Sequence, residues 1–384
     1  MKVAHVITRL ILGGAQENTV YTCIDLAQRY GVDVRLFTGP TTGPEGSLVD
    51  RVRQAGIPLT EIPAMIRAIR PLFDLRAYWQ LKRALQEFQP DVVHTHSAKA
   101  GILGRAAGRA LGVPVVVHTI HGAPWYPDGN WFSRTFNQTC ERWAARRSDH
   151  LIGVADAMGE LFFDAGIGLK ENYSTIYSGM EVEPFLQSEK FRIEARCRFG
   201  FSDDDIVFGK IARLFRMKGH DELIAAAEQV VKRVPNARFL LVGDGILRDS
   251  LEKMVHDKGL QDRFVFAGLV PPTEIPAVIS AMDIVVHTSL REGLARVLPQ
   301  GLLSGKPVVS YDIDGAREVV LNGQTGFLIP AHQVNELAAA LIQLGNDPEM
   351  RCRMGQTGRE RFTDRFRHET MTKQIFELYQ KLLK

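Results

Sequence analysis

The sequence predicts an α/β protein made of two doubly wound domains, each built on a parallel sheet. Three observations predict this. Apolar runs of strand length alternate with helical segments, the alternation occurs as two successive series, and 384 residues exceed what one hydrophobic core usually serves. The apolar runs also lack polar alternation, which is typical of parallel strands that are covered on both faces.

The first series opens with a predicted strand at residues 2–8, a tight Gly13-Gly14 loop and a helix at 17–30. This order is typical of a nucleotide-binding α/β unit. Further strands are predicted at residues 32–37, 91–94, 115–118 and 150–154. The Asp156 side chain is a candidate cap for the helix that follows the last of these strands.

Residues 64–85 combine five arginines and lysines with many apolar side chains. Pro71 prevents one continuous helix, and Asp74 is a candidate N-cap for a helix that follows it. Two interpretations remain open for this segment. It is either a packed helix with solvated arginines or a basic amphipathic patch that contacts an anionic membrane surface.

The second series follows a polar stretch at residues 187–198 and begins near Ile206. Its predicted strands lie at residues 206–212, 238–242, 264–267, 284–287 and 307–311, with helices between them. A last helix at 366–384 has apolar residues at helical spacing, so we expect it to pack back on the first domain. The predicted domains are therefore residues 1–186 and 187–365, followed by this helix.

Composition excludes several classes of protein. The chain is 45% hydrophobic and 24% charged, and its formal charge of +3 is far below that of a typical nucleic-acid-binding protein. Its four cysteines are widely spaced and form no pair at metal-ligand spacing. No apolar run reaches about 18 residues. We therefore expect a cytoplasmic protein that does not cross a membrane but can lie on the inner face of the cytoplasmic membrane.

Two stretches of the second series suggest a site for a phosphate ester. Arg213 and Lys218 follow a buried strand, and a guanidinium fork together with an ammonium suits a diphosphate. Residues 288–307 place Glu292 and Gly293 in a turn between a strand and a helix, where free N–H groups favour an anion. Taken alone, each feature could equally be a solvated surface charge or an ordinary turn.

Six ordered motifs carry a resemblance to a known family. They are the Gly-Gly loop, HTHSAKAGILGR from His94, HTIHG from His118, ARLFRMKG from Ala212, LVGDG from Leu241, and an EG turn followed by SGKPVVSYDIDGAREVV. Together they resemble glycosyltransferase family 4, and the match extends over nearly the whole chain. Within the family, the two histidine motifs are most similar to bacterial transferases that build surface polysaccharides or lipid-linked oligosaccharides.

The resemblance implies the GT-B fold, with two Rossmann-like domains facing a central cleft. It also implies a retaining transfer of a sugar from a nucleoside diphosphate donor, expected to be a UDP-sugar, to a glycan or polyprenyl-linked acceptor. No cofactor and no metal are expected. The acid pair Asp312 and Asp314 is therefore expected to orient loops rather than to bind a cation, since other hard-cation ligands are not gathered nearby.

The resemblance also assigns residues. Arg213 and Lys218 would hold the donor diphosphate, Glu292 would contact the donor sugar, and His121 would lie near the reacting carbon. The other residues implied for the donor region are Gly13, Gly14, Gly243, Gly268, Gly293 and Gln300, and those implied for the acceptor region are His96, Ser97 and Lys99.

One position departs from the family pattern. Gln300 stands where the family usually has a second glutamate that accepts hydrogen bonds from the donor ribose. An amide oxygen still accepts, but without the charge that strengthens a carboxylate acceptor. Two alternatives to a transferase remain open. A sugar-nucleotide epimerase of the same fold would share the diphosphate site, and Gln300 leaves open a catalytically silent sugar-nucleotide-binding protein.

Overall fold

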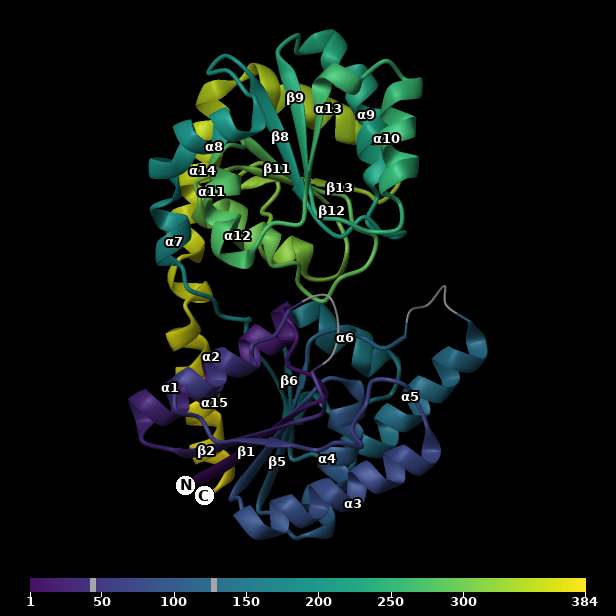
Figure 1. Ribbon diagram of the computed structural model, residues 1–384, viewed down its shortest axis with the longest axis vertical. Coiled ribbons are helices and arrows are strands. Elements are labelled where there is room, and N and C mark those ends of the chain that lie inside the picture. Colours follow the sequence, from purple (N-terminus) through teal and green to yellow (C-terminus); the bar gives the residue numbers. More distant parts are fainter. Residues whose placement is uncertain (42–45, 126–129) are drawn as a thin grey trace. The chain divides into compact units, whose positions relative to one another are not determined.

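The computed structural model describes residues 1–41, 46–125 and 130–384 of the chain, which form two compact units. Unit 1 comprises Met1–Met180 and Arg365–Lys384, and unit 2 comprises Glu181–Asp364. The predicted domain limits fell at 186 and 365. Figure 1 shows that each unit is a sheet with helices on both of its faces.

Unit 1 is built on a seven-stranded sheet in the order β3-β2-β1-β4-β5-β6-β7, and all its strand pairs are parallel. Its strands are β1 (Lys2–Ile7), β2 (Asp33–Thr38), β3 (Leu59–Glu61), β4 (Val92–His96), β5 (Val115–Ile120), β6 (His150–Gly153) and β7 (Tyr173–Thr175). Its helices are α1 (Gly14–Tyr30), α2 (Val49–Gln54), α3 (Pro71–Phe88), α4 (Ala98–Ala110), α5 (Trp131–Ala145), α6 (Asp156–Asp164) and α15 (His368–Leu382).

The C-terminal helix α15 belongs to unit 1, as the sequence predicts. It packs beside α1, and its Met371, Ile375 and Tyr379 enter the same apolar core as β1 and β4. A polar anchor reinforces this packing, because Asp25 of α1 accepts hydrogen bonds from His368 at 2.7 Å and from Thr372 at 3.1 Å.

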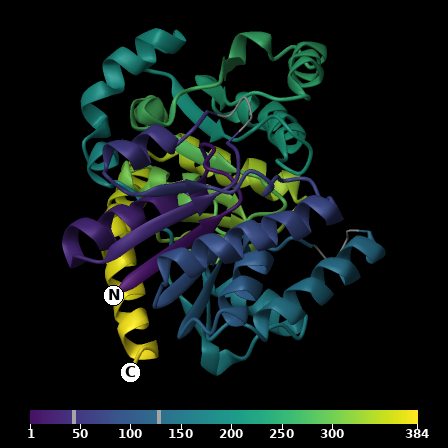
Figure 2. The ribbon, with the colours of Figure 1, turned by 60° about the horizontal axis from the view of Figure 1, so that its bottom comes forward.

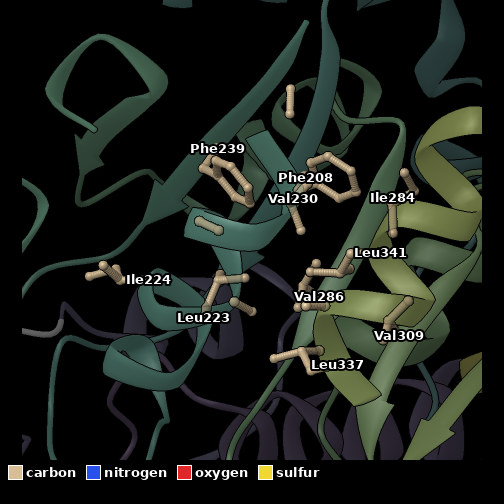
Figure 3. Close-up of a cluster of buried hydrophobic side chains, with 14 of the residues drawn as sticks. Phe208, Leu223, Ile224, Val230, Phe239, Ile284, Val286, Val309, Leu337 and Leu341 are labelled. Carbon is tan, nitrogen blue, oxygen red and sulfur yellow. The ribbon is translucent and has the colours of Figure 1, made fainter. Parts of the chain in front are cut away.

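Unit 2 is built on a six-stranded parallel sheet in the order β10-β9-β8-β11-β12-β13. Its strands are β8 (Ile206–Ile211), β9 (Ala237–Val242), β10 (Phe264–Gly268), β11 (Ile284–His287), β12 (Val308–Tyr311) and β13 (Gly326–Ile329). Its helices are α7 (Glu183–Leu186), α8 (Arg192–Phe199), α9 (His220–Arg233), α10 (Arg248–Asp257), α11 (Ile275–Ser280), α12 (Val297–Leu303), α13 (Val334–Asn346) and α14 (Pro348–Phe362). Figure 3 shows the core between this sheet and α9 and α13, where Phe208 and Phe239 stack.

In both sheets the strand order reverses beside the first strand of the unit. β1 lies between β2 and β4, and β8 lies between β9 and β11. At such a reversal the two connections leave toward opposite sides of the sheet, and the carboxyl ends of the two strands border a crevice in which open α/β sheets bind ligands. Each unit therefore has one favoured edge for a site, at β1/β4 and at β8/β11.

The structure corrects three predictions of helix ends. The first helix begins at Gly14, not at residue 17, with Gly13 at its N-cap. Asp74 does not cap α3, because Pro71 already occupies the first helical position, where its fixed φ and missing N–H are tolerated. Asp156 does not cap α6 either, since Ala155 is at the N-cap and the Asp156 carboxylate accepts a hydrogen bond from Thr175.

A buried ion pair joins α4 to α5 in unit 1. The guanidinium of Arg105 is fully buried, contacts the Glu141 carboxylate at 2.6 Å and donates to the Gly101 carbonyl at 2.8 Å. Arg105 is the last residue of the HTHSAKAGILGR motif. The motif therefore includes a structural link as well as residues at the sheet edge.

We predict that Glu141→Gln lowers the free energy of unfolding of unit 1 by about 3–5 kcal/mol, because it leaves the buried Arg105 charge without a partner. Urea unfolding followed by tryptophan fluorescence measures this unit, since all four tryptophans lie in it. The control is Glu87→Gln, which removes the exposed Arg83–Glu87 pair and should cost less than about 1 kcal/mol. Equal losses in the two variants would contradict the prediction.

Candidate active site

The predicted diphosphate-binding residues lie together at the β8/β11 edge of unit 2. Arg213 and Lys218 are in the loop between β8 and α9, and Glu292 is in the loop after β11. The Lys218 ammonium forms an ion pair with the Glu292 carboxylate, with both side chains partly exposed. Arg213 is exposed, with its guanidinium 5.1 Å from the ring of Phe215. Two cations and one acid thus meet at the edge where a ligand is expected.

Close backbone contacts hold these two loops together. Gly219, with φ of 61°, lies so near the β11 loop that a Cβ there would come within 2.1 Å of the Thr288 carbonyl oxygen. Thr288 donates its hydroxyl to the Gly219 carbonyl and accepts a hydrogen bond from Lys210 at 2.9 Å. Burial, and then the charge of Lys218, lowers the pKa of Lys210 to about 7.

Of the two acids after β12, Asp314 supports the Glu292 loop, as predicted, whereas Asp312 pairs with a nearby arginine. Asp314 accepts a hydrogen bond from the backbone N–H of Glu292 at 2.7 Å, and Gly315 donates to the Gly293 carbonyl at 3.1 Å. Asp312 pairs with Arg317 at 3.0 Å. Burial raises the pKa of Asp314. These contacts fix the backbone that carries Glu292.

Two glycines of the predicted donor region, Gly243 and Gly268, lie at the carboxyl ends of strands of the unit 2 sheet, whereas Gly13 and Gly14 lie in unit 1. Gly243 follows β9 and donates its N–H to the carbonyl of Gly268 at the end of β10, with 2.9 Å between the nitrogen and the oxygen. A Cβ at Gly243 would lie 2.2 Å from the carbonyl oxygen of Ala212, so only glycine allows this loop to approach the Arg213 loop. Gln300 is half-buried in α12, and within the described residues its side chain makes no hydrogen bond.

In unit 1 the other predicted site residues lie at the β1/β4 edge. Gly13 and Gly14 follow β1 and begin α1, while Ser97 and Lys99 follow β4 and begin α4. The Ser97 hydroxyl lies 2.7 Å from the Thr8 hydroxyl, which joins the two loops. Lys99 is paired with Asp74 of α3 and also donates to the Ala68 carbonyl. Its ammonium therefore ties α4 to the segment before α3.

His96 and His121 are members of a chain of three histidines. The Nδ1 atom of His5 in β1 lies 3.0 Å from Nε2 of His96, and Nδ1 of His96 lies 3.1 Å from Nε2 of His121, which follows β5. His5 and His96 are fully buried and His121 is partly exposed. His96 thus lies behind His121 and contacts it directly.

The direction of donation along this chain follows from its buried end. Nε2 of His5 is buried and has no hydrogen-bond partner among the residues that the structure describes. A buried N–H without a partner is rarer than an acceptor without one, so this atom is best assigned as the unprotonated nitrogen. His5 then donates to His96, His96 donates to His121, and the remaining N–H of His121 is on Nδ1. The chain thereby presents a neutral imidazole with a defined donor.

The rings of His5, His94 and His96 are also close enough together to hold a metal ion, with one ligand atom from each lying within 4.8 Å of the others. The hydrogen bonds argue against that use. His94 contacts the Tyr379 hydroxyl at 2.5 Å and the Thr119 hydroxyl at 2.6 Å through its two ring nitrogens, and both nitrogens of His96 contact other histidines. The cluster fits a hydrogen-bond network better than a ligand set.

Burial keeps this histidine cluster neutral. It lowers the pKa of His5 to about 3 and that of His121 to about 4, and the pKa values of His94 and His96 fall well below the ordinary value of 6.5. At neutral pH the β1/β4 edge therefore offers uncharged imidazoles, in contrast to the charged groups at the β8/β11 edge.

We predict that unit 1 loses stability as the pH falls from 6.5 toward 4. Above pH 6.5 these histidines are neutral in both the folded and the unfolded chain. Below pH 6.5 they bind protons in the unfolded chain, but in the folded chain their lowered pKa values keep them unprotonated. The loss is about 1.4 kcal/mol per pH unit for each such histidine. Urea unfolding followed by tryptophan fluorescence at a series of pH values measures it. His5→Gln should reduce the slope by one proton, whereas the exposed His256→Gln should not, and a pH-independent unfolding midpoint would contradict the prediction.

Sequence reasoning did not identify His5 or Lys210 as part of these edges. His5 and Lys210 interrupt otherwise apolar strands, and a polar residue within a buried strand is a signal that could have identified both of them. No sequence signal indicated that Lys218 pairs with Glu292, because that contact depends on the neighbouring positions of β8 and β11 in the sheet.

Comparisons with known proteins match both units. The model of the glycosyl transferase 4-like domain matches residues 13–173, and that of the glycosyl transferases group 1 matches residues 191–361. The chain is 28% identical, over 99% of its length and 96% of the relative, to an Escherichia coli UDP-Gal:alpha-D-GlcNAc-diphosphoundecaprenol alpha-1,3-galactosyltransferase. It is 30% identical, over 69% of its length and 70% of the relative, to the alpha-D-kanosaminyltransferase of Streptomyces kanamyceticus.

Solved structures also resemble the chain. The crystal structure of Anabaena HepE in complex with UDP-glucose has a TM-score of 0.81 and 26% identity, and the match covers 99% of this chain and all of that one.

Within the described residues, no helix is both long enough and apolar enough to cross a membrane.

Proposed function

The chain belongs to glycosyltransferase family 4 and has the GT-B fold, and we propose that it transfers a sugar from UDP to a lipid-linked diphosphate acceptor with retention of configuration and without a metal. That it is a glycosyltransferase was predicted from its motifs and is confirmed by its relatives. The galactosyltransferase relative supports the proposed donor and acceptor classes, and so does the UDP-glucose complex of HepE.

The observation that carries the proposal is the meeting of Arg213, Lys218 and Glu292 at the β8/β11 edge. When the bond between sugar and diphosphate breaks, negative charge develops on the leaving phosphate oxygens. A guanidinium and an ammonium that contact the diphosphate there would stabilise this charge without a metal. On this proposal the Lys218 ammonium turns from Glu292 to the diphosphate when the donor binds, and the freed carboxylate accepts hydrogen bonds from the sugar hydroxyls.

The proposed role of the neutral histidines is to bind the sugar rather than the nucleotide. His121 would donate from Nδ1 to a sugar oxygen, with His96 and His5 holding the ring in that tautomer. The acceptor hydroxyl would attack from the side that the leaving diphosphate occupies, and a phosphate oxygen would take its proton. Attack from that side retains the configuration at the reacting carbon.

One assay separates this function from its two alternatives. The protein is incubated with a radiolabelled UDP-sugar and a polyprenyl-diphosphate-linked sugar, with EDTA present. Transfer of label to the lipid with an unchanged anomeric configuration, determined by NMR, supports the proposal. Isomerisation of the donor without an acceptor would indicate an epimerase, and binding without turnover would indicate a silent binding protein. Loss of transfer in EDTA would overturn metal independence.

We predict that Lys218→Ala lowers kcat about a hundredfold or more and weakens UDP binding, because it removes a charge that stabilises the leaving group. Lys232→Ala, which changes an exposed lysine in the last turn of α9, is the control and should behave as the wild type. Glu292→Gln should keep the affinity for UDP and lose turnover. Turnover of Lys218→Ala within a few-fold of wild type would place the diphosphate elsewhere.

We predict that Gln300→Glu tightens donor binding about fivefold, because a charged acceptor contributes about 1 kcal/mol more than a neutral one. The Gln300 side chain has no hydrogen bond to lose within the described residues, so the change should leave the fold intact. Calorimetry with UDP measures the affinity. Gln261→Glu, an exposed change in the same unit, controls for net charge, and an equal response of both variants would exclude a ribose contact at Gln300.

A further inference from the structure

Large apolar side chains are exposed on two neighbouring parts of unit 1. One group lies at and just before the start of α3, and the other lies along α5. In the described part of unit 1, only Met1, Leu169 and Leu383 are comparably exposed elsewhere. The members are Ile69, Leu72, Phe73, Leu75, Trp79, Trp131, Phe132, Phe136 and Trp143, and we name them, with the cations among them, the α3–α5 surface. They include three of the chain's four tryptophans.

The sequence of α3 makes it apolar on two opposite faces. Its buried residues Ala77, Leu81 and Leu85 recur every four positions and pack on the sheet. Leu72 and Trp79 lie two turns apart on the opposite face, and they are 83% and 57% exposed. A helix that only covers a sheet needs one apolar face, so the second apolar face of α3 requires another explanation.

Helix α5 repeats the arrangement. The Asn130 side chain caps its N-terminus at 2.9 Å from the Phe132 nitrogen. Phe132, Phe136 and Trp143 follow at spacings of four and seven, which places them on one outward face, and their exposed fractions are 74%, 54% and 42%. Isolated exposed apolar residues need no explanation, but contiguous apolar patches mark interaction sites.

The charge of this surface is strongly positive. Residues 64–88 contain five arginines and lysines and residues 130–147 contain four arginines, against three acids in the two segments. Each of these acids is already paired, Asp74 with Lys99, Glu87 with Arg83 and Glu141 with Arg105. Positive charge is therefore in excess among the exposed aromatic rings.

A hollow of about 670 Å³ lies over α4, between α3 and α5. Figure 2 shows these three helices side by side on one part of unit 1. The walls of the hollow are mainly apolar, with Leu75 and Tyr78 on one side, Leu103 in the floor and Trp143 on the other side, and Arg109 and Arg147 also line it. Apolar walls with cations beside them match a lipid, which joins an apolar chain to an anionic head.

We propose that the α3–α5 surface binds the face of an anionic phospholipid bilayer. The tryptophans and phenylalanines enter the interfacial layer, which favours amphipathic aromatic rings, and the arginines attract the anionic head groups at about 1 kcal/mol each. The sequence left two interpretations open for residues 64–85, a packed helix and a membrane patch. Our proposal chooses the membrane patch and extends it to α5. This membrane contact is not part of the proposed function, which requires only that the acceptor can enter the candidate active site.

The test is flotation of the purified full chain with vesicles of phosphatidylcholine, either alone or mixed with phosphatidylglycerol. Binding is expected only to the anionic vesicles, with a blue shift of tryptophan emission and a decrease as salt rises. Phe132→Ser together with Phe136→Ser should weaken binding about tenfold, because two apolar rings are lost. The matched control changes two exposed apolar residues elsewhere, Ile193→Ser with Leu383→Ser, and should bind as the wild type.

A charge series completes the test. Arg67→Ala and Arg76→Ala should each weaken binding about fivefold, the factor that corresponds to about 1 kcal/mol per cation. The exposed pair Lys232→Ala with Arg233→Ala in α9 is the control. No flotation at low salt, equal flotation with neutral vesicles, or equal loss in surface and control variants would overturn the proposal. So would a dimer that forms through this surface without any binding to vesicles.

The test of the membrane surface can be separated from the test of the proposed function. The surface variants should transfer sugar to a water-soluble, short-chain acceptor at the wild-type rate, because none of them changes a residue of the candidate active site. Failure of transfer with intact vesicle binding would reject the proposed function alone. Intact transfer without vesicle binding would reject the membrane surface alone.

Discussion

The constraint on which the rest of the structure depends is that every strand pair in both sheets is parallel. Parallel strands need a crossover for each connection, so all the loops that leave the carboxyl ends of the strands gather at one edge of their sheet. The strand order then reverses beside β1 and beside β8. Residues far apart in the sequence, such as Lys218 and Glu292, become ion-pair partners only because β8 and β11 are neighbours at such a reversal.

The polar groups at the two sheet edges differ in charge. At the β8/β11 edge the charged groups keep contact with solvent, and Lys218 and Glu292 hold each other in place. At the β1/β4 edge the histidines are buried and stay neutral because burial lowers their pKa values. A departing diphosphate needs full charges, whereas an uncharged sugar is bound better by hydrogen-bond donors whose direction is fixed. Unit 2 therefore offers groups of the kind that stabilise a developing charge, and unit 1 offers groups of the kind that bind an uncharged ligand.

The sequence predicted the parts of this arrangement that local pattern determines. Uniform apolar runs predicted the buried parallel strands, and the order of six motifs predicted the family. The short strands β3, β7 and β13 were missed, because β3 and β7 contain no buried residue and β13 has buried residues only at its ends. The predicted N-caps at Asp74 and Asp156 were wrong, because Pro71 is the first residue of α3 and Ala155 is at the N-cap of α6. The contacts of His5 with His96 could not be predicted, since they require knowing which strands are neighbours. The outward apolar face of α5 was not predicted, because apolar residues at helical spacing are equally typical of a buried helix face.

Helix α4 connects the two functional features of unit 1. Its first turn, at Ser97 and Lys99, belongs to the β1/β4 edge, and its later residues Leu103 and Arg109 line the hollow of the α3–α5 surface. A helix of 13 residues is only about 20 Å long. On the proposed function, the polyprenyl chain of the acceptor would remain in the bilayer while its diphosphate head reaches the sheet edge. The Lys99–Asp74 ion pair links α3 to α4 at that edge, so it joins the helix of the proposed membrane surface to the loop that follows β4. Residues in this ion pair should therefore affect turnover on membrane-bound acceptors more than on soluble ones.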